Sequence, residues 1–148
     1  MKKKTHYISK KDKDQPSLVE EPLMVYNPLR MLPSLKDFTY YEFKKISDKA
    51  PFNQSEWASF LHVSERTLQR YAKGEGSFAA INAERAMQVA GVLEVGKNIF
   101  GTTAQFYTWL KSNPPMLEGV LSLESLTSAH GIQMVLIQLG RIQHGILA

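Results

Sequence analysis

Charged and amide side chains gather in residues 64–73, which read SERTLQRYAK. Arginine and glutamine can form paired hydrogen bonds with guanine and adenine in the major groove of DNA, and lysine and arginine also bind phosphates. Val63, Leu68 and Tyr71 recur at helical spacing and would bury one helix face, which leaves the polar side chains exposed. The residues that this pattern predicts to contact DNA are Gln54, Ser64, Arg66, Thr67, Gln69, Arg70 and Lys73.

Two short amphipathic helices within residues 54–74 would hold these side chains in place. Trp57 and Leu61 lie four residues apart on one face of the first helix. Ser64 occupies the N-cap position of the second helix, and Gly74 the position of a helix-terminating glycine. A helix, a tight turn and a second, capped helix predict a helix-turn-helix.

The turn between these helices departs from the usual pattern. His62 stands where helix-turn-helix proteins often have glycine. Histidine adopts a left-handed backbone conformation more readily than a β-branched residue does, although at some energetic cost. The alternative interpretation is a helical hairpin whose charged face is simply solvated.

The composition narrows the function classes. The absence of cysteine excludes a disulfide scaffold, thiolate catalysis and thiolate zinc sites. No apolar run approaches membrane-spanning length and no signal sequence is present, so we expect a cytoplasmic protein with no membrane partner. The four histidines are scattered, and no glycine-rich phosphate loop follows a strand. We therefore expect no enzymatic activity, no metal and no cofactor.

The positive charge is confined to the beginning of the chain. Six lysines and two aspartates give the first fifteen residues a charge of 6 − 2 = +4, and the remaining 12 basic and 12 acidic residues balance. This arm would attract phosphates in a salt-dependent way, or would serve only as a disordered terminus. Four prolines in residues 16–34 exclude a long helix there. We expect residues 1–38 to form a Lys-rich and Pro-rich leader, whose apolar part packs on this chain or another.

The rest of the chain predicts an all-α fold in two parts. Residues 39–80 would form the helix-turn-helix domain, and residues 81–148 a C-terminal helical domain. Thr39 would cap the first helix, which ends at Ala50-Pro51. The later helices are expected at about Ile81–Val95, at Thr102–Lys111, briefly within Met116–Leu126 with Ser122 as its cap, and from near Ala129 or Gly131 onward.

The last expected helix is apolar on more than one side, because Met134 and Ile137 widen its apolar stripe. Such a helix must bury more than one face, which favours a symmetric dimer. The alternative is a central helix buried within its own domain. The predicted interface residues are Met134, Val135, Leu136 and Leu139.

Several short motifs occur in a characteristic order from about Thr39 to the end of the chain. Thr67, Leu68 and Arg70 match a threonine-leucine-x-arginine pattern, and Arg85 follows in the next expected helix. The further matching residues are Phe100-Gly101, Trp109-Leu110, Asn113, Pro114, Leu117, Gly119, Gly140, Arg141, Ile142 and Gly145. In this order they resemble the Xre/MbcA/ParS-type antitoxins, the partners of RES-domain toxins. Two residues depart from the family pattern: Ser122 replaces a proline, and Asn82 replaces a serine as a predicted helix cap.

The resemblance implies an antitoxin of a type II toxin–antitoxin system. Its C-terminal domain would dimerise and block an NAD-consuming RES-domain toxin, and its helix-turn-helix would bind operator DNA and repress its own operon. The NAD chemistry belongs to the toxin, so the antitoxin itself would need no cofactor. Two alternatives remain: a stand-alone helix-turn-helix repressor without a toxin partner, and an inhibitor whose helix-turn-helix no longer binds DNA.

The end of the chain is unusually apolar for a terminus. Three apolar residues follow Gly145, and such residues require a surface to bury on. They would either fold back on their own domain or, by the resemblance, plug the mouth of the toxin's NAD site. The predicted toxin-contacting residues are Arg141, Gln143, His144, Gly145, Ile146, Leu147 and Ala148.

Overall fold

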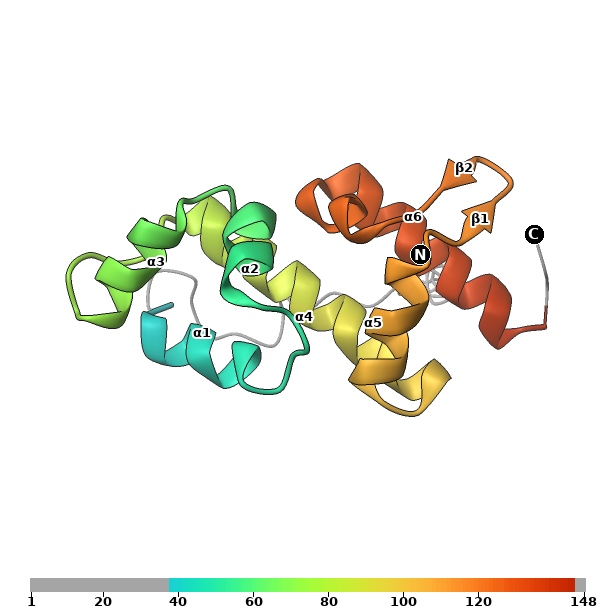
Figure 1. Cartoon of the computed structure of the whole chain (residues 1–148), viewed down its shortest axis with the longest axis horizontal. Coiled ribbons are helices and arrows are strands. Elements are labelled where there is room, and N and C mark those ends of the chain that lie inside the picture. Colours follow the sequence, from blue (N-terminus) through green and yellow to red (C-terminus); the bar gives the residue numbers. More distant parts are fainter. Residues whose placement is uncertain (1–37, 146–148) are drawn as a thin grey trace, which may run out of the picture.

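The computed structural model describes residues 38–145, and this part of the chain is mostly helical (Figure 1). The α-helices are α1 (Tyr40–Ser47), α2 (Gln54–Leu61), α3 (Glu65–Ala72), α4 (Ala80–Phe100), α5 (Thr103–Lys111) and α6 (Ala129–Gln143). A 3-10 helix, η5 (Leu123–Thr127), precedes α6, and the strands β1 (Pro115–Met116) and β2 (Gly119–Val120) form an antiparallel pair. The mostly helical fold is confirmed, whereas the hairpin replaces part of an expected loop.

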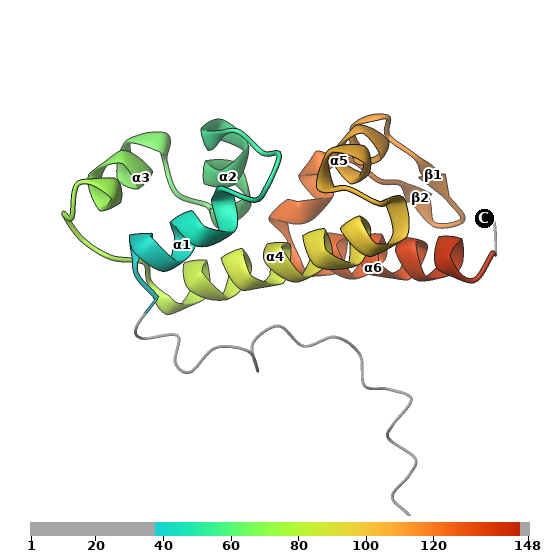
Figure 2. The same cartoon turned by 90° about the horizontal axis from the view of Figure 1, so that it is seen from below.

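The long helix α4 is the element on which the others are assembled. It has 21 residues and runs along the molecule, with α1, α2 and α3 over its first half (Figure 2). α5 and α6 pack against its second half. No helix in residues 38–145 is both long enough and apolar enough to cross a bilayer.

The prediction that α4 ends near Val95 is wrong, because the helix continues through Gly96 to Phe100. Gly96 is buried, and a Cβ atom there would lie 2.5 Å from the Phe106 ring. The glycine therefore allows α5 to approach α4 closely instead of interrupting it. The residue that follows Phe100 and caps the helix is Gly101, whose φ of 99° favours glycine.

Side-chain caps fix the beginnings of most helices. Thr39 caps α1, as predicted, and Thr102 caps α5. Ser122 caps η5, again as predicted, and Ser128 caps α6. Such caps satisfy backbone amides that have no partner within the helix, which stabilises each start by about 1 kcal/mol.

The prediction of Asn82 as a cap is wrong. The N-cap residue of α4 is Ala79, which has no side-chain acceptor. Asn82 lies inside the first turn, where its Nδ2 donates a hydrogen bond to the carbonyl oxygen of Leu61 at 2.7 Å. Its amide group thus joins α4 to the end of α2.

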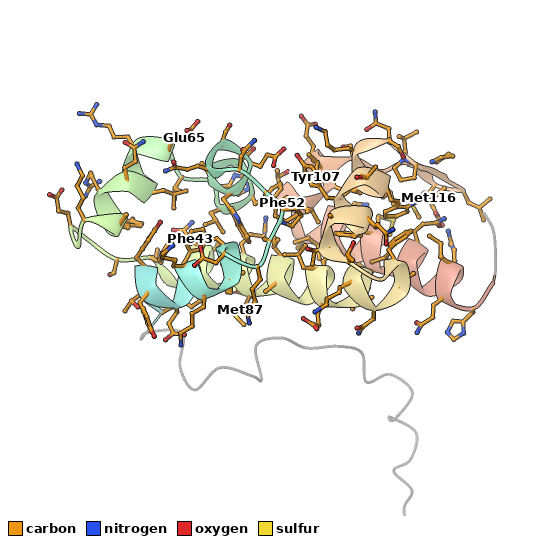
Figure 3. All side chains as sticks on the ribbon, turned by 60° about the horizontal axis from the view of Figure 1, so that its bottom comes forward. Phe43, Phe52, Glu65, Met87, Tyr107 and Met116 are labelled. Carbon is orange, nitrogen blue, oxygen red and sulfur yellow. The ribbon has the colours of Figure 1, made fainter. Side chains whose placement is uncertain are left out.

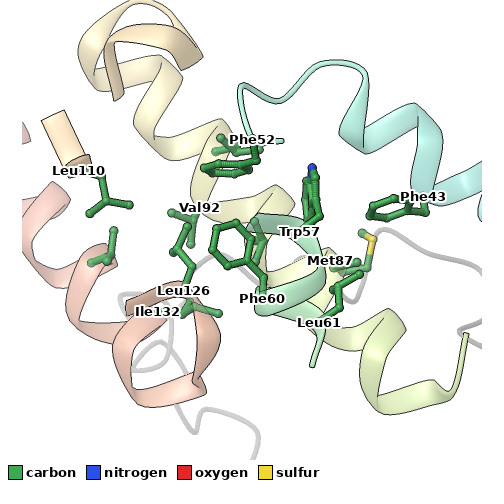
Figure 4. Close-up of a cluster of buried hydrophobic side chains, with 14 of the residues drawn as sticks. Phe43, Phe52, Trp57, Phe60, Leu61, Met87, Val92, Leu110, Leu126 and Ile132 are labelled. Atoms are coloured by element: carbon green, nitrogen blue, oxygen red, sulfur yellow. The ribbon is translucent and has the colours of Figure 1, made fainter. Parts of the chain in front are cut away.

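The core is one continuous cluster, to which both the residues before α4 and those from α4 onward contribute. Phe43 and Phe52 point into the molecule, whereas Glu65 lies on the outer surface of α3 (Figure 3). Trp57 makes edge-to-face contacts with both phenylalanines at centroid distances of 5.1 and 5.5 Å. Phe60 and Leu126 continue the cluster toward α6 (Figure 4). Both predicted parts of the chain therefore share one packed interior.

Candidate nucleic-acid interface

Helix α3 is short but fixed at both ends. Ser64 Oγ accepts a hydrogen bond from the Thr67 amide at 3.0 Å and donates one to Thr67 Oγ1 at 2.9 Å. At the other end, the amide of Glu75 donates to the carbonyl of Arg70 at 2.9 Å while Gly74 adopts a φ of 85°. This is the glycine-terminated ending expected from the sequence. Leu68 is the buried side chain that anchors the helix to the core.

The outer face of α3 presents four of the seven residues predicted to contact DNA. Arg66, Gln69, Arg70 and Lys73 are exposed and line one open depression together with Glu75. Three cations, one amide and one carboxylate therefore share one exposed surface. Guanidinium and amide groups in such a position can donate hydrogen bonds to base edges or phosphates.

The other three predicted residues occupy different places. The hydroxyls of Ser64 and Thr67 are paired with each other and cap the helix. Gln54 is exposed in the first turn of α2, beside a hollow that also includes Leu68 of α3. These three residues do not line the depression: Ser64 and Thr67 fix the start of α3, and Gln54 belongs to α2.

The turn before α3 is held by a contact that the sequence did not reveal. His62 has φ 60° and ψ 40°, which is the left-handed conformation considered possible for a histidine at this turn. Its Nε2 lies 2.6 Å from the carbonyl oxygen of Thr127, which can only accept, so Nε2 donates. Arg85 Nη1 donates to the same carbonyl at 2.5 Å. The end of η5 therefore anchors the turn that sets the direction of α3.

The start of α2 is tied to the other half of the molecule as well. The hydroxyl of Tyr107 in α5 donates a hydrogen bond to Glu56 Oε2 at 2.9 Å. Burial, together with this bond to the carboxylate, raises the pKa of the Tyr107 hydroxyl. The other oxygen of Glu56 accepts from the Asn53 amide and completes a capping box. α2 is thus fixed at both ends by residues of the C-terminal half.

The predicted dimer interface on α6 is only partly available. Val135 and Leu139 are fully buried within the chain's own core, so these two side chains cannot line a surface between subunits. Met134 and Leu136 are half-buried, and both pack against the edge of that core. Assignment of Val135 and Leu139 to a dimer interface is therefore corrected, because α4 and η5 cover that side of α6.

One of the predicted toxin-contacting residues, Arg141, contacts the turn between β1 and β2. Arg141 forms a two-pronged ion pair with Glu118, with nitrogen-to-oxygen distances of 3.0 and 3.2 Å. The hydrogen bond from Arg141 lowers the pKa of the Glu118 carboxyl. Gln143, His144 and Gly145 are exposed. The apolar residues Ile146, Leu147 and Ala148 lie outside the described residues.

No protein-family model matches the chain, and no curated protein matches it. The resemblance to RES-partner antitoxins therefore stays a prediction based on its motifs. Within residues 38–145, no three His, Cys, Asp or Glu side chains lie close enough to hold a metal ion. The exposed face of α3 brings together the three cations predicted to contact DNA.

Proposed function

We propose that this chain is a DNA-binding regulator that uses α2, the turn at His62 and α3 as a helix-turn-helix. One observation carries the proposal: the exposed face of α3 presents Arg66, Gln69 and Arg70 together, on a helix capped at both ends. An eight-residue helix is about 12 Å long, comparable to the roughly 12 Å width of the major groove. Such a helix can enter the groove without rearrangement.

The surrounding residues fit the same role. Lys73 at the end of α3 and Gln54 at the start of α2 would contact phosphates and fix the register of the helix on DNA. Because α2 is anchored at Glu56 and His62, the orientation of α3 is determined before DNA is bound. Preorganisation of this kind reduces the ordering cost of binding.

We propose in addition, from the family resemblance, that the regulator is an antitoxin. It would neutralise an NAD-consuming RES-domain toxin through its C-terminal part and repress its own operon through α3. The exposed chain end at Gln143, His144 and Gly145 lies where the predicted plug would begin.

Binding to the DNA upstream of the chain's own gene tests the first proposal. Arg66→Ala and Arg70→Ala should each weaken the band shift, whereas Lys111→Ala should not. Lys111 is the matched control because it is an exposed cation at the end of α5, away from α3. Equal affinity of all three variants and the wild type, with unchanged circular dichroism, would reject α3 as the recognition helix.

Co-expression with the product of the neighbouring gene tests the second proposal. The full chain should protect cells, and truncation after His144 should abolish protection while DNA binding is retained. Full protection by the truncated chain at equal abundance would exclude the tail as the inhibitory element. A chain that shifts DNA but neither binds nor neutralises the neighbour's product would instead be a stand-alone repressor.

A further inference from the structure

A groove of about 430 Å³ lies on the molecule away from the depression on α3. Ile46 of α1 and Ala90 and Leu93 of α4 supply its apolar lining. Lys45, Lys49 and Lys97 supply its charged lining. The groove thus combines an apolar surface with several cations, and it joins α1 to the second half of α4.

The charges around the groove favour an acidic occupant. Three lysines line it, and Glu94 is the single carboxylate among the lining residues. Lys45 also lies 3.6 Å from Glu42, on its own helix, so part of its charge is compensated. Lys49 and Lys97 are exposed. A segment with carboxylates between apolar side chains would complement both the charge and the apolar surface.

The leader of this same chain contains such a segment. Residues 18–25 read LVEEPLMV, in which Glu20 and Glu21 are flanked by apolar residues on both sides. The described residues begin with buried Phe38, two positions before α1, and α1 itself lines the groove. The connecting residues 26–37 span up to about 40 Å when extended, at roughly 3.3 Å per residue. This is several times the roughly 12 Å length of an eight-residue helix such as α1.

We infer that residues 18–25 of the same chain dock in this groove, with Glu20 and Glu21 facing the lysines and the apolar residues covering Ile46 and Leu93. A short tether gives the leader an effective concentration on the order of millimolar, far above that of a second copy in dilute solution. The docked leader would contact α1, α4 and the beginning of α5 at the same time. This interaction is independent of whether α3 binds DNA.

Disulfide trapping in the full chain tests the inference. Because the sequence has no cysteine, no native thiol can form a competing disulfide. The variant pair Leu23→Cys and Glu94→Cys places one thiol on the leader and one on the groove wall. The control pair, Leu23→Cys and Glu65→Cys, uses another exposed glutamate on α3, a helix that also contacts α1. Because a disulfide requires closely spaced Cα atoms, its rate of formation reports proximity.

The groove pair should oxidise about tenfold faster than the control pair, within single chains and independently of protein concentration. Lys45→Glu combined with Lys97→Glu should slow this reaction, and adding Glu20→Lys with Glu21→Lys should restore it. Equal rates for the two pairs would overturn the inference. Cross-links formed only between chains would also overturn it and would assign the groove to a second copy. Charge reversal that weakens DNA binding without changing the cross-linking rate would assign the lysines to phosphates instead.

Discussion

His62 and Thr127 are 65 positions apart in the chain, yet His62 Nε2 lies 2.6 Å from the Thr127 carbonyl oxygen. The bond joins the turn before α3 to the last residue of η5. In this position His62 has a strained, left-handed backbone conformation, which a glycine would adopt without strain. Histidine at this turn is therefore a compromise between local conformation and a long-range contact.

Substitutions of His62 should show both contributions. His62→Ala loses the hydrogen bond and keeps the left-handed conformation, so it should lower the free energy of unfolding by about 1 kcal/mol. His62→Gly loses the same bond but relieves backbone strain of about 1 kcal/mol, so its stability should stay near that of the wild type. Urea denaturation measures both variants.

The comparison between the two variants contains its own control, because both lack the imidazole. Arg85 still donates to the Thr127 carbonyl in each, so no buried acceptor is left without a partner. An alanine variant as stable as the glycine variant would show that residue 62 is not left-handed in solution.

The elements that the sequence predicted correctly depend on local signals. Ser64, Thr39 and Gly74 lie within one turn of the helix end that each specifies, so their types alone indicated those ends. The exposed polar face of α3 was also predictable, because it is the complement of the apolar positions Leu68 and Tyr71. In each case the residues that indicate the structure lie within or next to the helix concerned.

The features that were missed depend on residues far apart in the chain. Gly96 is a helix breaker by type, and only the Phe106 ring packed on it explains why the helix continues. The apolar pattern of α6 could not reveal which side of the helix α4 and η5 cover. It therefore could not show that Val135, and not Leu136, is fully buried within the same chain. A backbone carbonyl such as that of Thr127 leaves no signal in the sequence at all.

Two glycines of α6 should respond in opposite ways to alanine. A Cβ atom at Gly131 would overlap the carbonyl oxygen of Ser125, which belongs to the backbone of η5 and cannot rotate away. Gly131→Ala should therefore lower the free energy of unfolding by about 2–3 kcal/mol. Gly140→Ala meets no atom within 4 Å and should raise it by about 0.5–1 kcal/mol through helix propensity.

Thermal and urea unfolding of these two variants provides the measurement. Since both carry the same substitution in the same helix, the difference between them isolates the close approach of η5. Stabilisation by Gly131→Ala would contradict the described packing of η5 on α6.

The ion pair between Glu118 and Arg141 should make the hairpin sensitive to acid. The hydrogen bond from Arg141 lowers the Glu118 pKa below its usual value of 4.5. The stabilisation is therefore complete above the unfolded-state pKa and is lost as the pH falls through the lower, folded-state pKa. Nuclear magnetic resonance titration of the Glu118 carboxyl should give a lower pKa in the wild type than in Arg141→Gln.

A second variant distinguishes the contribution of Glu118 to the pH dependence of stability from that of the other carboxylates. The difference in free energy of unfolding between the wild type and Glu118→Gln should become smaller as the pH is lowered below the usual glutamate range. A difference that stays constant across that range would mean that the ion pair does not form in solution.

If the chain dimerises through α6, Leu136 and Leu139 should behave differently. Leu136 is half-buried, so Leu136→Asp should separate subunits while much of the helical circular dichroism is retained. Leu139 is fully buried, and Leu139→Asp should unfold the chain because it places an unpaired charge in the core. Sedimentation measures the oligomeric state. A wild type that sediments as a monomer at micromolar concentration would reject the dimer.

The last prediction separates base reading from phosphate binding on α3. Arg70 is exposed in the last turn of α3, and Arg70→Ala should cost about 1–3 kcal/mol in binding to the preferred DNA while reducing the preference over a scrambled duplex. Lys73 lies at the end of the helix, and Lys73→Ala should weaken binding to both duplexes equally. It should also reduce the slope of log affinity against log salt by about one. Band shifts over a range of salt concentrations measure all three quantities. If both variants weaken both duplexes equally, α3 contacts only the DNA backbone and does not read the sequence.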